Sequence, residues 1–175
     1  EQFMELRGMS ISLVIDCRIE ADDFGRWSYA PETKYMYLPT DDSYGHSIPN
    51  GHFDAAVLAA RSFIEDGGKV FAHCHMGINR GPSTAMAILM DQGMAPEAAF
   101  DLIRAKRPIA GIAYAEDAVR AHYARLGYPP SAINNRLAKF RAHRNVVFSE
   151  KEQDAVAHKL REHHAIDREE LANAR

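Results

Sequence analysis

The chain has 175 residues and a formal net charge of −3 at pH 7, with a sequence pI near 6.3. Hydrophobic residues make up 46% and charged residues 26%, as in an ordinary globular domain. The acidic balance argues against binding nucleic acid through bulk positive charge, and no apolar run is long enough to span a membrane. Because only Cys17 and Cys74 are cysteines, we expect a reducing, cytoplasmic setting without a disulfide framework.

The first half of the sequence predicts short buried strands separated by loops and one helix. Three runs are apolar and rich in strand-forming residues: ISLVIDC at 11–17, YMYLP at 35–39 and KVFAH at 69–73. The segment 40–52 is dense in turn-forming residues and predicts a loop. Apolar residues then recur at helical spacing from Phe53 to Ile64, and Gly67-Gly68 ends that helix.

Helices dominate the sequence after the third strand. Pro82 stands where the first turn of a helix tolerates proline, and Gly93 stands where that helix ends. Further helices are predicted from Pro96 to just before Pro108, over 116–125 and over 131–144. This strand–loop–helix order predicts an α/β fold with a central, mostly parallel sheet flanked by helices.

We divide the chain into an α/β domain at 1–130 and a helical C-terminal extension at 131–175. The extension contains the basic helix at 131–144 and a last helix at 150–164, which Ser149 and Glu152 mark as a capping box. A narrow apolar stripe follows the basic helix: Ile133, Leu137 and Phe140. We expect this stripe to pack on the domain and the basic side chains to lie in solvent.

Residues 73–80, HCHMGINR, place a cysteine and an arginine on the turn between the third strand and the next helix. Backbone N–H groups and the helix dipole meet at such a turn and favour binding of a tetrahedral anion. Gly77 lets the backbone curl, and Arg80 supplies a planar two-pronged donor for phosphate oxygens. The same positive field stabilises the thiolate of Cys74, which predicts in-line attack on phosphorus and a phosphocysteine intermediate.

Expulsion of the substrate alcohol needs a proton donor, and hydrolysis of the phosphocysteine needs a group that activates water. The loop at 40–52 offers Asp41 and Asp42, and it follows a strand that we expect beside the central strand. Either carboxyl group can give a proton to the leaving oxygen and then take one from water. The other aspartate is a turn former.

These features resemble the dual-specificity branch of the cysteine-dependent protein phosphatases. The resemblance covers roughly residues 10–127 and rests on the motifs HCHMGINR, VIDCR, DDS, FDAAVLAARSFIEDGGKVFAHC and APEAAFDLIRAKRP. It implies a nucleophile at Cys74, a phosphate clamp at Arg80 and a general acid at Asp42 or Asp41. The family's usual DS pair favours Asp42, whereas the length of the loop before the helix keeps Asp41 open. The resemblance also implies a phosphate-binding loop of His75, Met76, Gly77, Ile78, Asn79 and Arg80.

We expect two neighbours of this loop, His73 and Ser83, to support it. His73 orients the loop rather than reacting. The family usually has Ser or Thr directly after the arginine, where the hydroxyl group helps the thiolate to leave, but this chain has Gly81. Ser83 or Thr84 is the available substitute, and we expect slow hydrolysis of the phosphocysteine if neither acts.

We therefore expect a monomeric phosphatase for phosphotyrosine and/or phosphoserine/threonine in protein substrates, with no cofactor and no membrane or nucleic-acid partner. The alternatives are an RNA 5′-triphosphatase-like enzyme, suggested by the NR ending of the motif, a phosphate-binding pseudophosphatase, suggested by Gly81, and a rhodanese-like sulfur carrier. A zinc site at His73 and His75 is disfavoured because adjacent side chains at a strand end point apart. Cys17 reads as a small core residue rather than a disulfide partner of Cys74.

Overall fold

The computed structural model describes residues 6, 8–27, 30, 32–43 and 45–147. Within these residues one parallel sheet has the strand order β2-β1-β3, which confirms the predicted sheet. The strands are β1 (Leu13–Asp16), β2 (Lys34–Tyr37) and β3 (Val70–His73). Asp16 is paired with Tyr37 on one side and with His73 on the other. The carboxyl ends of all three strands therefore lie level at one edge of the sheet.

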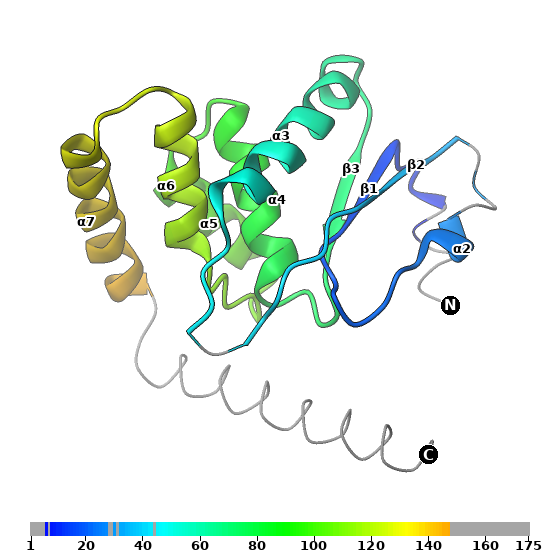
Figure 1. Ribbon diagram of the computed structural model, residues 1–175, viewed down its shortest axis with the longest axis horizontal. Coiled ribbons are helices and arrows are strands. Elements are labelled where there is room, and N and C mark those ends of the chain that lie inside the picture. The colour runs from blue at the N-terminus through cyan, green and yellow to red at the C-terminus, as the bar shows by residue number, and fades with distance from the viewer. Residues whose placement is uncertain (1–5, 7, 28–29, 31, 44, 148–175) are drawn as a thin grey trace, which may run out of the picture.

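Helices cover both faces of this sheet. They are α2 (Phe24–Trp27), α3 (Asn50–Glu65), α4 (Arg80–Asp91), α5 (Pro96–Lys106), α6 (Ala115–Arg125) and α7 (Pro130–Val147). In Figure 1, α3 to α6 form a layer on one face, α2 lies on the opposite face and α7 is outermost. The structure confirms the predicted helices up to α7, whereas the predicted helix at 150–164, with Ser149 and Glu152, lies outside the described residues.

The middle strand β1 is buried on both sides. Leu13 and Ile15 are 3% and 0% exposed and belong to the main core with α3 to α7. Val14 points to the opposite face, where it packs in a second cluster with Trp27 of α2. Coverage of both faces explains why the sequence of this strand is an unbroken apolar run rather than an alternating one.

Helix α3 begins at Asn50, so the predicted loop at 40–52 is three residues too long. Pro49 has extended backbone angles directly before the helix, as expected for the residue at a helix start. The apolar pattern missed the first turn because its inward-facing side chain is a histidine. His52 is 7% exposed, and its Nε2 lies 3.1 Å from Oγ1 of Thr84.

Helix α7 packs through its apolar stripe, as predicted. Phe140 is fully buried, and its ring meets the ring of Phe100 edge-on at a centroid distance of 5.6 Å. The basic face is less solvated than we expected, because Arg136 lies over the Tyr123 ring and Arg141 makes a 2.6 Å ion pair with Glu116. The division between residues 130 and 131 stays a prediction. None of the described helices is both long and apolar enough to cross a bilayer.

Candidate active site

The loop between β3 and α4 turns its carbonyl groups to the outside. Gly77 has a φ of 63°, which favours glycine. Arg107 donates from Nε to the Gly77 carbonyl at 2.7 Å and from Nη2 to the Met76 carbonyl at 2.8 Å. The Ile78 carbonyl accepts from two backbone N–H groups, those of residues 111 and 112, both at 3.0 Å. Three consecutive carbonyls are thus fixed by partners outside the loop.

This arrangement turns backbone N–H groups to the inside of the loop. In a trans peptide, the N–H bond of each residue and the preceding C=O bond lie in one plane and point in opposite directions. Outward carbonyls at 76, 77 and 78 therefore turn the N–H groups of Gly77, Ile78 and Asn79 inward. Across the described ranges, none of these three N–H groups has a hydrogen-bond acceptor. Consecutive inward N–H groups at a helix N-terminus form an anion-binding concavity.

Cys74 is the first residue of this loop, directly after β3. It is 6% exposed and is a free thiol. It borders a cavity of about 730 Å³ with His75, Met76 and Gly77, but this cavity is lined on its other sides by Trp27 and Arg107 and not by Arg80 or Asp42. The sulfur atom is therefore carried by the same short segment whose N–H groups turn inward.

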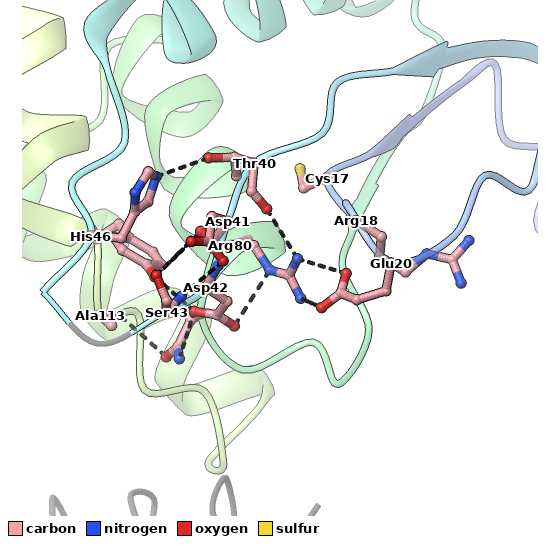
Figure 2. A network of polar contacts seen from close by, with 12 residues as sticks. Cys17, Arg18, Glu20, Thr40, Asp41, Asp42, Ser43, His46, Arg80 and Ala113 are labelled. Atoms are coloured by element: carbon pink, nitrogen blue, oxygen red, sulfur yellow. Dashed lines mark hydrogen bonds and ion pairs between the residues drawn. The ribbon is translucent and has the colours of Figure 1, made fainter. Parts of the chain in front are cut away.

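Arg80 is the first residue of α4, and its side chain is 2% exposed. Its Nη1 and Nη2 donate to the two carboxylate oxygens of Glu20 at 2.8 and 2.7 Å, and Nη1 also donates to the Thr40 carbonyl at 3.1 Å. Nε lies 3.4 Å from Oδ2 of Asp42. Figure 2 draws this contact as a dashed line. Burial alone would lower the pKa of Arg80, but the Glu20 bonds and the charges of Asp42 and Cys74 raise it, so the guanidinium is a permanent cation.

The two candidate acids have different surroundings. Asp42 accepts a 2.8 Å hydrogen bond from the Tyr114 hydroxyl group and a 3.3 Å bond from the Asn79 side chain. Asp41 accepts from the N–H groups of Asp42 and Ser43 and from the Ser43 hydroxyl group, so it closes a turn of its own loop. The Ser43 hydroxyl bond, with the two N–H bonds, lowers the pKa of Asp41. The structure therefore brings the carboxyl group of Asp42 to the loop between β3 and α4 and to Arg80.

Gly81 lies against the end of β3 and the backbone of Cys74. A Cβ atom at this position would be 2.9 Å from the backbone nitrogen of Cys74 and 2.9 Å from the carbonyl carbon of His73. Such distances are too short for any side chain unless the backbone shifts. The missing hydroxyl group at this position is therefore coupled to a close approach of α4 to β3.

The two predicted substitutes for that hydroxyl group differ in their partners. Thr84 Oγ1 is engaged by His52 and lies 3.4 Å from the sulfur of Cys17. Ser83 is fully buried, and its Oγ has no hydrogen-bond partner in the described part of the chain. Of the two, only the Ser83 hydroxyl group keeps an unused donor.

Cys17 and His73 are supporting core residues in this structure. The backbone N–H of Cys17 donates to the His73 carbonyl at 2.8 Å, which confirms that its strand runs beside β3. Burial raises the pKa of Cys17 to about 12, so its thiol is neutral at physiological pH. The His73 ring stacks on Phe71 at 5.2 Å, and burial lowers the pKa of His73. Both observations fit a structural role.

One acidic cluster near the site holds an arginine instead of a metal. Asp16, Asp23 and His73 offer ligand atoms within 4.8 Å of one another. The guanidinium of Arg18 lies among them, with Nη2 at 2.8 Å from Asp16 and 2.5 Å from Asp23. This side chain already supplies the positive charge that the carboxylates require.

Sequence reasoning missed three residues at the site: Arg107, which bonds to the loop carbonyls, Glu20, which bonds to Arg80, and Tyr114, which bonds to Asp42. Glu20 follows β1 by four positions, so a search of every strand's carboxyl end for charged residues would have found it. Arg107 lies in the motif APEAAFDLIRAKRP, on which the resemblance rests, but sequence reasoning gave it no role. Nothing in the local sequence of Tyr114 indicates that it reaches the site. Their role depends on how the helices fold back over the sheet.

Several solved structures have a similar fold. Tk-PTP in its active form aligns with a TM-score of 0.60 at 18% identity, covering 71% of this chain and 85% of its own. PTPMT1 aligns with a TM-score of 0.56 at 21% identity, covering 79% and 88%. Human DUSP28 aligns with a TM-score of 0.54 at 17% identity, covering 78% and 81%. The chain therefore shares the fold of these solved structures.

The family follows from the sequence comparisons. A family model described as the dual specificity phosphatase catalytic domain matches residues 2–114, and the chain belongs to this family. Dual specificity protein phosphatase 5 of Homo sapiens is 37% identical over 79 residues, which are 45% of this chain and 20% of that protein. Dual specificity protein phosphatase 1-A of Xenopus laevis is 31% identical over 77 residues, 43% and 21% of the two chains. The chain thus spans about a fifth of these relatives' length, and the predicted resemblance is confirmed.

Proposed function

We propose that this protein hydrolyses phosphate monoesters on phosphotyrosine and/or phosphoserine/threonine of protein substrates, through a phosphocysteine at Cys74. The convergence of Arg80 and Asp42 beside a loop with inward N–H groups carries the proposal. Family membership supports it independently. This arrangement offers a nucleophile, an anion cradle, a cationic clamp and a carboxyl group within one small volume.

In the first proposed step, the Cys74 thiolate attacks phosphorus and the bond from phosphorus to the leaving oxygen breaks. Asp42 gives its proton to that oxygen, so the alcohol leaves neutral. The loop N–H groups and Arg80 stabilise the charge on the three equatorial oxygens. In the second step, Asp42 takes a proton from water while the water oxygen attacks phosphorus. The phosphorus–sulfur bond then breaks, and inorganic phosphate and the thiolate are released.

We assign the general acid to Asp42 rather than Asp41. Oδ2 of Asp42 lies 3.4 Å from Nε of Arg80, so a phosphate held by that guanidinium would lie within reach of the carboxyl group. The carboxyl group of Asp41 is instead engaged in its own turn, by the N–H groups of Asp42 and Ser43 and by the Ser43 hydroxyl group. These surroundings support Asp42, which the sequence favours because Asp42 and Ser43 match the family's usual DS pair.

The test uses p-nitrophenyl phosphate and three variants of the full chain. Cys74→Ser removes the nucleophile, and turnover should be lost. Asp42→Asn should lower kcat by about 10²–10⁴-fold at neutral pH, as expected for loss of general acid–base catalysis. Asp41→Asn is the matched control and should change kcat far less. Full activity of Cys74→Ser would refute the proposal, and a larger loss in Asp41→Asn than in Asp42→Asn would transfer the acid to Asp41.

Gly81 favours one second candidate, a phosphate-binding pseudophosphatase. Without a hydroxyl group directly after the arginine, departure of the thiolate loses a donor. The signature of this candidate is binding of phosphopeptides, or one burst of product, without turnover. A panel of phosphotyrosine peptide, phosphothreonine peptide and 5′-triphosphorylated RNA separates the substrate classes and also tests the RNA 5′-triphosphatase alternative.

We further propose a cytoplasmic, monomeric protein that acts on phosphorylated proteins without membrane or nucleic-acid partners. The two unpaired cysteines, Cys17 and Cys74, support a reducing compartment. Every proposed chemical step is assigned to a side chain, to the backbone or to water, so the mechanism requires no cofactor and no metal.

A further inference from the structure

We propose that Glu20 is a positioning residue that holds the guanidinium of Arg80 so that one edge of it faces the phosphate. The inference rests on the proposed function, in which Arg80 is the phosphate clamp. Glu20 lies on the segment between β1 and α2, and its carboxylate reaches Arg80 across 60 positions of sequence. Figure 2 shows this carboxylate facing the end of the guanidinium.

The contacts of Arg80 divide its five N–H donors into two sets. Glu20 binds one N–H of Nη1 and one of Nη2 at the end of the fork, at 2.8 and 2.7 Å. The other N–H of Nη1 donates to the Thr40 carbonyl at 3.1 Å. The remaining donors are the Nε–H and the second N–H of Nη2. In a planar guanidinium these two N–H bonds point to the same side. One edge of the guanidinium therefore carries two parallel donors that neither Glu20 nor Thr40 uses.

This remaining edge has the properties of a ligand donor. Within the described ranges, Nε of Arg80 is buried and has no hydrogen-bond partner. Buried polar groups without partners are rare in native proteins because they have lost water without replacement. Two oxygens of a phosphate match the spacing of two parallel N–H donors. The edge therefore fits a tetrahedral oxyanion.

Glu20 fixes the orientation of the Arg80 guanidinium, because it binds Nη1 and Nη2 and leaves the edge with Nε–H open to the ligand. Burial alone would raise the pKa of Glu20, but its bonds to Arg80 hold the pKa below its usual range, so the carboxylate is ionised. The side chain of Glu20 is 43% exposed, whereas that of Arg80 is 2% exposed. Without Glu20, the guanidinium is free to rotate and pair more closely with Asp42, whose Oδ2 lies 3.4 Å from Nε. Such a pair would occupy the edge that phosphate needs.

The opposite role is also testable. A carboxylate that competed with phosphate for the guanidinium would weaken substrate binding. Removal of Glu20 would then tighten the binding of an oxyanion and lower KM. If Glu20 is a positioning residue, its removal instead weakens the binding of an oxyanion and raises KM.

The experiment measures tungstate affinity by calorimetry and the kinetics with p-nitrophenyl phosphate, on the full chain. The variants are Glu20→Ala and the conservative Glu20→Gln, which keeps one carbonyl acceptor for the guanidinium. Glu116→Ala is the matched control, because it removes another arginine-paired glutamate, the partner of Arg141 on the far helices. Glu20→Ala should weaken tungstate binding about tenfold or more and raise KM, as expected for two lost bonds to a charged group. Glu20→Gln should lie between Glu20→Ala and the parent, and Glu116→Ala should match the parent.

Unchanged or tighter tungstate binding in Glu20→Ala, with correct folding by circular dichroism, overturns the inference. If Glu20→Ala does not fold, Glu20→Gln decides by the same measurement, since its shape is conserved. A different result would refute the proposed function. If the parent binds tungstate and this binding depends on Glu20, but no turnover depends on Cys74, the protein is not a phosphatase of the proposed kind. The positioning role of Glu20 would then still hold.

Discussion

The hydroxyl group of Tyr114 donates a 2.8 Å hydrogen bond to Oδ1 of Asp42, although 72 positions separate the two residues. Tyr114 directly precedes α6, whereas Asp42 lies on the loop after β2. Burial and the negative charge of Asp42 raise the pKa of Tyr114, so its hydroxyl group keeps the proton that it donates. The loop that carries the proposed general acid is thereby tied to the helical layer.

Removal of this hydroxyl group by Tyr114→Phe should lower kcat about 3–10-fold, because a hydrogen bond to a charged group contributes about 1.5–3 kcal/mol, part of which the Asn79 bond retains. The loss should be larger for an alkyl phosphate than for p-nitrophenyl phosphate, since a poor leaving group depends more on proton donation. Tyr37→Phe on β2, where the side chain is 39% exposed, is the control and should match the parent. Equal losses for both substrates would show that Tyr114 does not act through the acid.

The Gly81→Ser substitution introduces the family's usual hydroxyl group but should impair this protein. The new Cβ atom would lie 2.9 Å from backbone atoms of His73 and Cys74, so β3 and α4 have to separate. We expect a loss of about 1–3 kcal/mol in the free energy of unfolding and a lower kcat/KM. Gly51→Ala is the matched control, because its Cβ meets nothing within 4 Å, and it should leave stability unchanged or slightly higher. A faster and equally stable Gly81→Ser variant would contradict the close approach.

His52 should make the protein less stable as the pH falls. Burial lowers the pKa of His52 from 6.5 to about 4. The folded and the unfolded protein therefore differ in proton binding at His52 only between about pH 4 and pH 6.5. Above pH 6.5 the ring is neutral in both states, and stability is complete. Below it the unfolded chain takes up a proton that the folded chain refuses, which costs about 3 kcal/mol by pH 4.

The measurement compares urea unfolding of the parent and of His52→Gln from about pH 7.5 down to about pH 4. The difference in the free energy of unfolding between the two proteins should shrink by about 3 kcal/mol as the pH falls. Other groups titrate equally in both proteins and cancel in this difference. A constant difference across the range would mean that the ring is protonated inside the folded protein.

Phe140 should anchor α7 to the rest of the fold. Its ring is fully buried against Phe100, so Phe140→Ala should lower the free energy of unfolding by about 3–5 kcal/mol. Val146 on the same helix is 85% exposed, and Val146→Ala should change stability by no more than about 0.5 kcal/mol. A single cooperative transition with this loss would show that α7 belongs to the folding unit. A small loss in Phe140→Ala would support the predicted division after residue 130.

The parts of the fold that the sequence predicts are those set by local chemistry. The apolar runs locate β1, β2 and β3, and the cysteine-to-arginine spacing locates the loop between β3 and α4, because Cys74 begins this loop and Arg80 directly follows it. Glu20 and Tyr114 escaped prediction because each meets the loop only after the chain has folded back. The start of α3 was missed for a related reason: the buried ring of His52 replaces the apolar side chain that the pattern requires.

Arg80 makes contacts with segments that follow each of the other two strands: Glu20 after β1, and Thr40 and Asp42 after β2. Competence of the site is therefore a property of the complete sheet. A proteolytic fragment that begins after residue 43 would still carry the cysteine motif, but it would lack every acidic partner of its arginine described here. Heat inactivation should for the same reason follow the global melting curve, with no inactive but natively packed species preceding it.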